Sequence, residues 1–97
     1  MAYAYNNRGL AWHRLGMRAE GRADIEHSLR LDGQNAYAHR NLGICYFDQG
    51  DYAAALPHFE RAHRLGTAPP ELAAYLRQTR QQLGLDSATD EQPPSEK

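Results

Sequence analysis

Three glycines stand at a constant spacing in this chain of 97 residues. Gly16, Gly50 and Gly84 follow one another at intervals of 34 residues, and the residues around them recur at the same interval without a gap. A fixed period of this length is typical of a solenoid, in which each repeat is one supersecondary unit and neighbouring repeats bury a shared core. The recurring pairs are Ala2 and Ala36, Asn7 and Asn41, Gly9 and Gly43, Trp12 and Tyr46, Ile25 and Phe59, and Leu31 and Leu65. The spacing predicts two full repeats, 2–35 and 36–69, and a partial third.

Each full repeat carries two helical patterns separated by a glycine turn. In the second repeat, apolar residues recur at steps of three and four, as one buried face of a helix requires. Gly50 provides a helix stop, Asp51 an N-cap for the helix that follows, and Asn35 an N-cap for the helix before. We expect about five helices in an all-α fold, stacked as antiparallel hairpins, near 2–15, 18–31, 36–49, 52–65 and 70–83.

The third repeat contains only its first helix. Pro70 suits a first helical turn, and Glu71 complements the positive end of the helix dipole. Arg77 stands where the complete repeats have a glycine, so no further helix is expected to pack there. We interpret 70–84 as a C-terminal capping helix. The acidic segment 85–97 is rich in proline and serine and has almost no apolar residue, which predicts a disordered tail.

The second repeat resembles a known family. Its motifs Leu42-Gly43-x-x-Tyr46, Gly50-Asp51-Tyr52, Ala55-x-x-x-Phe59 and Ala62 look like a tetratricopeptide repeat. The first repeat matches more loosely, because Arg8 stands where the second repeat has Leu42. The resemblance covers about residues 2–84. It implies a domain 1–84 that is a right-handed superhelical solenoid of helical hairpins.

Composition argues against several other classes. The chain is 41% hydrophobic with a formal net charge of −1, which suits one small soluble domain. No apolar run approaches the length that spans a membrane, and polar residues at 6–8 interrupt any secretion signal, so we expect a cytoplasmic protein. Cys45, the single cysteine, lies on an apolar helical face and is expected to be structural, with a protonated thiol.

The polar residues do not form a recognisable reactive centre. No two histidines have the i, i+4 spacing of a helical zinc site, and the acids are scattered over helix exteriors. The histidines are His13, His27, His39, His58 and His63. The arginines could contact nucleic-acid phosphates, but interspersed acids neutralise them and the chain has no basic excess. We expect no catalytic residue, no metal or other cofactor, and neither a nucleic-acid nor a membrane partner.

The resemblance implies a binding surface instead, because in tetratricopeptide arrays the first helix of every hairpin lines a concave groove. The repeat register projects that groove onto Tyr3, Asn6, Leu10, His13, Arg14, Tyr37, Arg40, Ile44, Phe47, Asp48, Ala74, Gln78 and Gln81. Aromatic, apolar and hydrogen-bonding groups alternate along this wall, as in a peptide groove. Leu10, Ile44 and Phe47 could instead belong to the core.

We therefore expect a non-enzymatic protein-interaction module that binds a peptide or helical segment of a partner protein. The alternative is a structural spacer or oligomerisation segment of a longer tetratricopeptide protein. The N-terminal edge keeps both readings open, because no polar helix covers Tyr3, Tyr5 and Leu10 and repeat arrays need capped ends. Either the chain is the C-terminal part of a longer array, or two chains form a weak homodimer through this edge.

Overall fold

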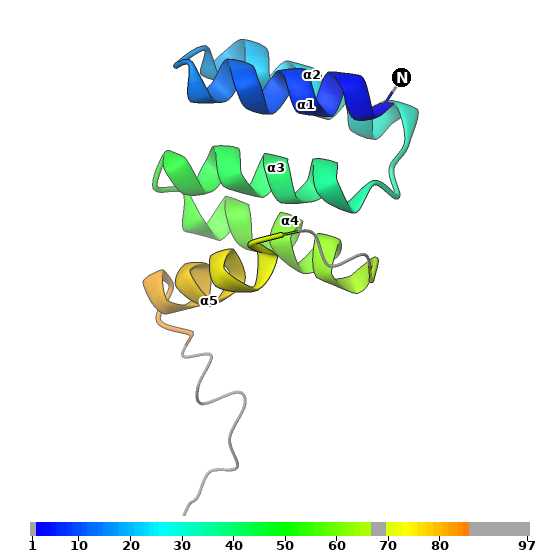
Figure 1. Ribbon diagram of the computed structural model, residues 1–97. Helices are drawn as coiled ribbons and strands as arrows, with labels where there is room; N and C mark the ends of the chain where they lie inside the picture. The colour runs from blue at the N-terminus through cyan, green and yellow to red at the C-terminus, as the bar shows by residue number, and fades with distance from the viewer. Residues whose placement is uncertain (1, 67–69, 86–97) are drawn as a thin grey trace, which may run out of the picture.

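The computed structural model describes residues 2–66 and 70–85, with side chains described from residue 4 onward, and these residues are all-α. The five helices are α1 (Ala2–Arg14), α2 (Arg18–Leu31), α3 (Ala36–Asp48), α4 (Tyr52–Arg64) and α5 (Leu72–Gln82) (Figure 1). Each lies within its predicted range, so the all-α hairpin fold is confirmed. The predicted acidic tail lies, apart from Leu85, outside the described residues.

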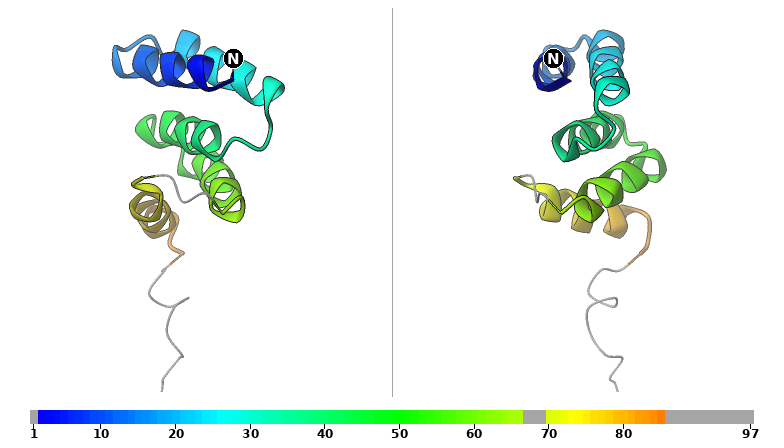
Figure 2. Two further views of the ribbon diagram at one scale, coloured as in Figure 1. Left: turned by 45° about the vertical axis from the view of Figure 1, so that its right-hand side comes forward. Right: turned by 90° about the vertical axis from the view of Figure 1, so that its right-hand side faces the viewer.

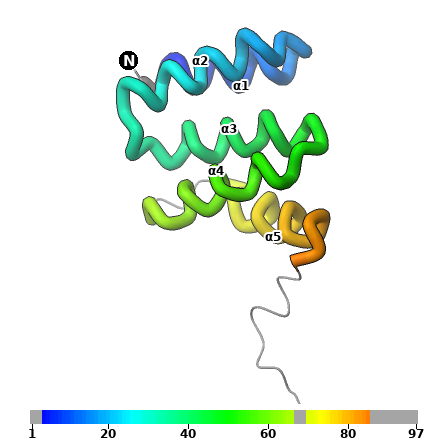
Figure 3. The backbone as a smooth tube through the Cα atoms, turned by 180° about the vertical axis from the view of Figure 1, so that it is seen from behind, coloured from blue at the N-terminus to red at the C-terminus, as the bar shows by residue number. Residues whose placement is uncertain are grey.

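The helices stack in layers, with the α1 and α2 hairpin on the α3 and α4 hairpin and α5 beneath (Figure 1). Seen along the layers, α1 and α3 lie on one side of the stack and α2 and α4 on the other (Figure 2). The opposite view places α2 and α4 in front (Figure 3). Helix α3 contacts all four other helices, and buried residues are most numerous on it. The stack is therefore organised around α3.

The turns and caps follow the predicted chemistry. Gly16, Gly50 and Gly84 have φ angles of 91°, 80° and 77°, in the left-handed region where a helix ends most easily at glycine. Asp51 Oδ1 accepts a hydrogen bond of 3.1 Å from an amide in the first turn of α4. Asn35 Oδ1 accepts two such bonds, of 3.0 and 3.2 Å, from the first turn of α3. Both predicted N-caps are confirmed.

Helix α5 begins two residues later than the sequence predicts. Glu71 has a φ of 68°, so the chain turns at this residue and the helix begins at Leu72. The carbonyl oxygen of Pro70 accepts a hydrogen bond from Arg40 Nη1 at 3.2 Å, which ties the turn to α3. Pro70 and Glu71 therefore lie beside α3 and not in the first turn of α5.

Gly43 brings α3 and α4 into close contact at the centre of the core. A Cβ atom on Gly43 would lie 2.6 Å from the ring of Phe59, a residue with no exposed surface. The ring is fixed from its other sides, because Tyr75 stacks on it at 5.3 Å and Phe47 meets it edge-on at 6.4 Å. Phe59 therefore fills the space that the missing side chain leaves, and it has little room to withdraw.

The first hairpin has a charged residue at a repeat position where the second hairpin has an apolar one. Leu42 is buried with Ile25 and Cys45, but Arg8 at the corresponding place in α1 is exposed. Arg8 donates two hydrogen bonds to Asp24, from Nε at 2.6 Å and from Nη2 at 2.9 Å. These bonds lower the pKa of Asp24. Arg8, which makes the first repeat a looser match to the family, thus forms an ion pair with Asp24.

The predicted apolar N-terminal edge needs correction at Leu10. This side chain is partly buried and packs against the cluster that contains Ile44, so it belongs to the interior side of α1. Tyr5 is half-buried, with its ring 4.3 Å from the ring of His27 and the guanidinium of Arg8 at 5.4 Å. The register placed Leu10 at the edge, but α3 covers that side of α1.

A row of stacked rings lies along the contact between α3 and α4. The rings of Tyr46 and His58 are nearly parallel with centroids 5.6 Å apart, and His39 follows at 6.2 Å. The guanidinium of Arg22 lies over Tyr46 at 5.6 Å. Burial lowers the pKa of His58, and the neighbouring His39 lowers it further. The folded protein therefore favours the neutral form of His58.

Replacing Gly43 by leucine should lower the free energy of unfolding by about 2–4 kcal/mol, because the new side chain meets a ring that cannot move. Urea unfolding followed by circular dichroism measures this difference. Gly33→Ala is the matched control, since the nearest atom to its Cβ would be a carbonyl oxygen at an ordinary 3.6 Å. Equal loss in both variants would contradict the close contact of α3 and α4.

The lowered pKa of His58 predicts acid sensitivity. The unfolded chain takes up a proton near the ordinary pKa of about 6.5, before the folded chain does, so the free energy of unfolding should fall as pH drops below this value. Urea unfolding at a series of pH values gives the slope. His58→Gln should make the slope shallower than in the wild type. An identical slope for His58→Gln would count against the burial effect.

Candidate functional site

An open pocket of about 300 Å³ lies between α3 and α5. Its lining consists of Phe47, Glu71, Ala74, Tyr75 and Gln78. The rings of Phe47 and Tyr75 meet edge to face, with centroids 5.1 Å apart, and both are partly exposed. The exposed side chains of Glu71 and Gln78 add a carboxylate and an amide. The pocket thus combines an aromatic floor with polar groups at its rim.

Arg40 places a partly buried positive charge beside this pocket. Its Nε and Nη2 atoms donate to Asn41 Oδ1 at 3.0 and 2.8 Å, and its guanidinium lies 5.5 Å from the ring centroid of Tyr37. Burial lowers the pKa of Arg40, while Glu71 opposes that shift. Within 2–66 and 70–85, no carboxylate lies at ion-pair distance from this guanidinium. The charge is held by neutral oxygens.

Behind Arg40, a buried pair of asparagines joins the two repeats. Asn41 Nδ2 donates to Asn6 Oδ1 at 2.8 Å, and each residue is only 1% exposed. Asn41 Oδ1 in turn accepts from Arg40, so the amide is used on both sides. The position of the guanidinium therefore depends on a hydrogen-bonded chain that runs from α1 into α3.

A second polar link between α1 and α3 reaches the same face. His13 Nε2 lies 2.8 Å from Asp48 Oδ2, and this ring nitrogen donates when it carries the proton. The side chain of His13 is 3% exposed, whereas that of Asp48 is 42% exposed. The carboxylate is thus held in place from within while remaining open to solvent.

The structure separates the predicted groove residues into two groups. On the surface, wholly or in part, lie Arg14, Tyr37, Arg40, Phe47, Asp48, Ala74, Gln78 and Gln81. Buried are Asn6, His13 and Ile44, while Leu10 is partly buried and packs against the core, as Phe47 also does. The placement of Asn6, His13 and Ile44 on the groove surface was wrong, because α1 and α3 pack against each other and bury these side chains. The side chain of Tyr3 lies outside the described part of the chain.

Two lining residues were absent from the predicted groove. Tyr75 stacks on Phe59 while its edge meets Phe47 at the surface. Glu71 was assigned to a helical turn, but the left-handed backbone there brings it beside α3. The prolines before Glu71 were the available signal that the chain turns at this point.

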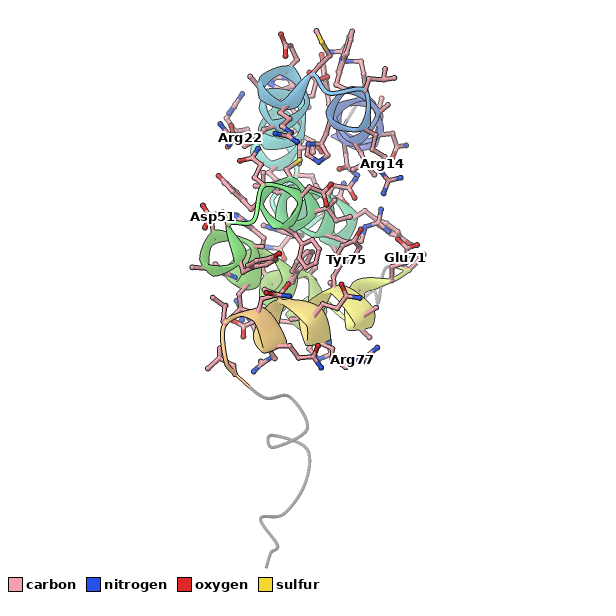
Figure 4. All side chains as sticks on the ribbon, turned by 90° about the vertical axis from the view of Figure 1, so that its left-hand side faces the viewer. Arg14, Arg22, Asp51, Glu71, Tyr75 and Arg77 are labelled. Carbon is pink, nitrogen blue, oxygen red and sulfur yellow. The ribbon has the colours of Figure 1, made fainter. Side chains whose placement is uncertain are left out.

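The polar and aromatic groups gather on one side of the stack. Arg14, Tyr75 and Glu71 lie on the side formed by α1, α3 and α5, while Arg22 and Asp51 lie on the opposite side (Figure 4). We call the surface formed by Arg14, Tyr37, Arg40, Phe47, Asp48, Glu71, Tyr75 and Gln78 the α3 face. It carries charges of both signs around the aromatic pocket.

Three further features bear on the chemistry of the described residues. Burial raises the pKa of Cys45 to about 11, so its thiol is protonated near neutral pH and is a poor nucleophile. In 2–66 and 70–85, no three histidine, cysteine or acidic side chains gather as a metal site would require. None of the helices described is long and apolar enough to cross a membrane.

Comparison with known proteins identifies residues 36–65 as a match to the family model described as "Tetratricopeptide repeat". The chain is 33% identical over 63 residues to "Protein SGT1 homolog" of Bos taurus, which is 65% of this chain and 19% of that protein. It is 32% identical over 63 residues to "Superkiller complex protein 3" of Homo sapiens, again 65% of this chain but 4% of that protein. The chain therefore spans less than a fifth of the length of these relatives.

The asparagine pair supplies a test of how the α3 face is supported. Asn6→Ala should lower the free energy of unfolding by about 1–3 kcal/mol, because it leaves a buried amide of Asn41 without its acceptor. The control is Asn7→Ala, an exposed neighbour in the same helix. Urea unfolding measures both. If Asn6→Ala is as stable as Asn7→Ala, the buried hydrogen bond does not join the repeats.

Proposed function

Because residues 36–65 are a tetratricopeptide repeat in an all-α stack, we propose that the chain is a non-enzymatic protein-interaction module of the cytoplasm. Its α3 face binds an extended or helical segment of a partner protein. The partner places an apolar side chain in the pocket between α3 and α5 and a carboxylate on Arg40. This proposal keeps the exposed residues of the predicted groove and adds Tyr75 as an apolar contact.

The proposal rests mainly on Arg40, whose guanidinium is partly buried and has no ion-pair partner among the described residues. A guanidinium that is partly removed from water and lacks an ion pair forms stronger bonds to a carboxylate than a fully hydrated one does. Its neighbours fix its position, so little side-chain entropy remains to be lost on binding. Exposed Arg14 adds positive charge at the same side of the stack. An acidic group of a partner is the ligand that this arrangement favours.

The pocket favours a partner that carries an apolar side chain next to that acidic group. Partly exposed aromatic rings in a concave site are typical anchors of protein interfaces, where a few buried side chains supply most of the affinity. Phe47 and Tyr75 are held by their contacts with buried Phe59. The relative named as a superkiller complex protein is, by its name, part of a complex, which agrees with an interaction role.

A structural spacer or oligomerisation segment is the alternative function. It is supported by the N-terminal hairpin, whose turn exposes Leu15 and Met17 at 76% and 41%. In that case the α3 face is unoccupied and the stack only spaces or pairs other parts of a protein. The two readings differ in whether binding depends on Arg40 and Phe47.

Selection of peptides from a random library on the immobilised chain should enrich sequences that combine an acidic residue with an apolar one. Arg40→Gln and Phe47→Ala should each weaken the binding of an enriched peptide about 5- to 150-fold in fluorescence anisotropy, because interface anchors contribute roughly 1–3 kcal/mol. Arg18→Gln, an exposed arginine on α2, is the control and should bind as the wild type does. Circular dichroism establishes that all variants are folded.

Equal affinity in all four proteins would place the binding elsewhere and would contradict the proposal. Failure to enrich any peptide would favour the spacer function. Sedimentation of the wild type at several concentrations then measures self-association directly.

A further inference from the structure

Helices α4 and α5 are rich in arginine. Helices α4 and α5 together contain four arginines and one acidic residue, a net charge of +3 with the histidines neutral. The arginines are Arg61, Arg64, Arg77 and Arg80, and the acid is Glu60. The whole chain has a formal net charge of −1. The excess at this end is therefore balanced by acids elsewhere in the sequence.

Part of this charge surrounds a second open pocket, of about 280 Å³, between α4 and α5. Its lining consists of Glu60, His63, Arg64, Leu76 and Arg80. Arg80 Nη2 lies 3.1 Å from Glu60 Oε2, so the one acid of the pocket is already paired. Arg64 is exposed and has no ion-pair partner within 2–66 and 70–85. Arg77 lies on the outer side of α5 (Figure 4).

The balancing acids lie directly after α5. Residues 86–97 contain Asp86, Asp90, Glu91 and Glu96 and one lysine, a net charge of −3. These residues begin next to Leu85, the last residue described, so they are tethered to the basic end. The tether gives an effective concentration in the millimolar range, as for other short flexible linkers.

The geometry allows the segment to reach the pocket. Leu76 lies nine residues before Leu85 along the helix and its terminal turn, a distance of roughly 14 Å at the helical rise. Twelve residues in extended form span up to about 40 Å. The segment can therefore turn back along α5 and place its carboxylates beside Arg64 and Arg77.

We propose that the acidic segment 86–97 docks on the α4 and α5 surface, with its carboxylates near Arg64 and Arg77 and its chain across the pocket that contains Leu76. The docked segment covers the end of the stack. The pocket of the α3 face has a different lining. The binding is electrostatic and intramolecular, so it weakens with salt and does not depend on protein concentration.

A spin label on the full chain tests this proposal. Ser95→Cys provides the attachment site, and the buried Cys45 should not react because its thiol stays protonated. Unlabelled wild type treated with the reagent verifies that Cys45 is unmodified. The measured quantity is the loss of amide signal in ¹H–¹⁵N spectra caused by the label.

At low salt, the amides of 63–64 and 76–80 should lose at least about twofold more signal than those of α2. In about 1 M salt this excess should disappear, because the Debye length is then only about 3 Å. Arg64→Glu with Arg77→Glu should also remove it. The matched double variant Arg18→Glu with Arg30→Glu, at the exposed surface of α2, should retain it. Mixing ¹⁵N chain without label and labelled chain without ¹⁵N should give no loss.

Three results would overturn the proposal. The first is an excess loss of amide signal that does not change with salt or with the arginine substitutions, as expected for a segment that is tethered nearby without docking. The strongest loss could fall on the α3 face around Arg40, so that the segment occupies the other site. Signal loss in the mixed sample would assign the contact to a second copy of the chain.

Discussion

The close contact of Gly43 with Phe59 is the constraint on which the rest of the structure depends. It brings α3 and α4 together, and it fixes a ring that has no exposed surface. Tyr75 and Phe47 rest on that ring, so the position of α5 and the aromatic floor of the α3 face follow from the same contact. A core residue thereby determines the shape of a surface pocket.

The polar part of the α3 face has a comparable internal support. The buried pair of Asn6 and Asn41 holds Arg40, and buried His13 holds Asp48. Both links run between the first and second repeats, so the contacts that pack the two repeats together also position the surface charges. These charges are one cation and one anion.

The sequence predicted the helices, their caps and the repeat family well because those depend on local patterns. Asp51 and Asn35 act within one turn, and the period places Gly16, Gly50 and Gly84 at helix ends. The groove was predicted less well, because it depends on which helices meet. Asn6 and Ile44 are buried since α3 contacts helices on several sides, a property that no single helix pattern contains. Glu71 became a pocket residue through one left-handed backbone angle.

The central claim is that a partner segment binds the α3 face between Arg40 and Tyr75. Titration of the ¹⁵N-labelled chain with a selected acidic peptide tests it most directly, because amide shifts locate the contact without any mutation. The claim predicts that the largest shifts fall on residues 37–48 and 71–78, with little change in α2. Shifts concentrated on α2 and α4, with 37–48 and 71–78 unchanged, would contradict it.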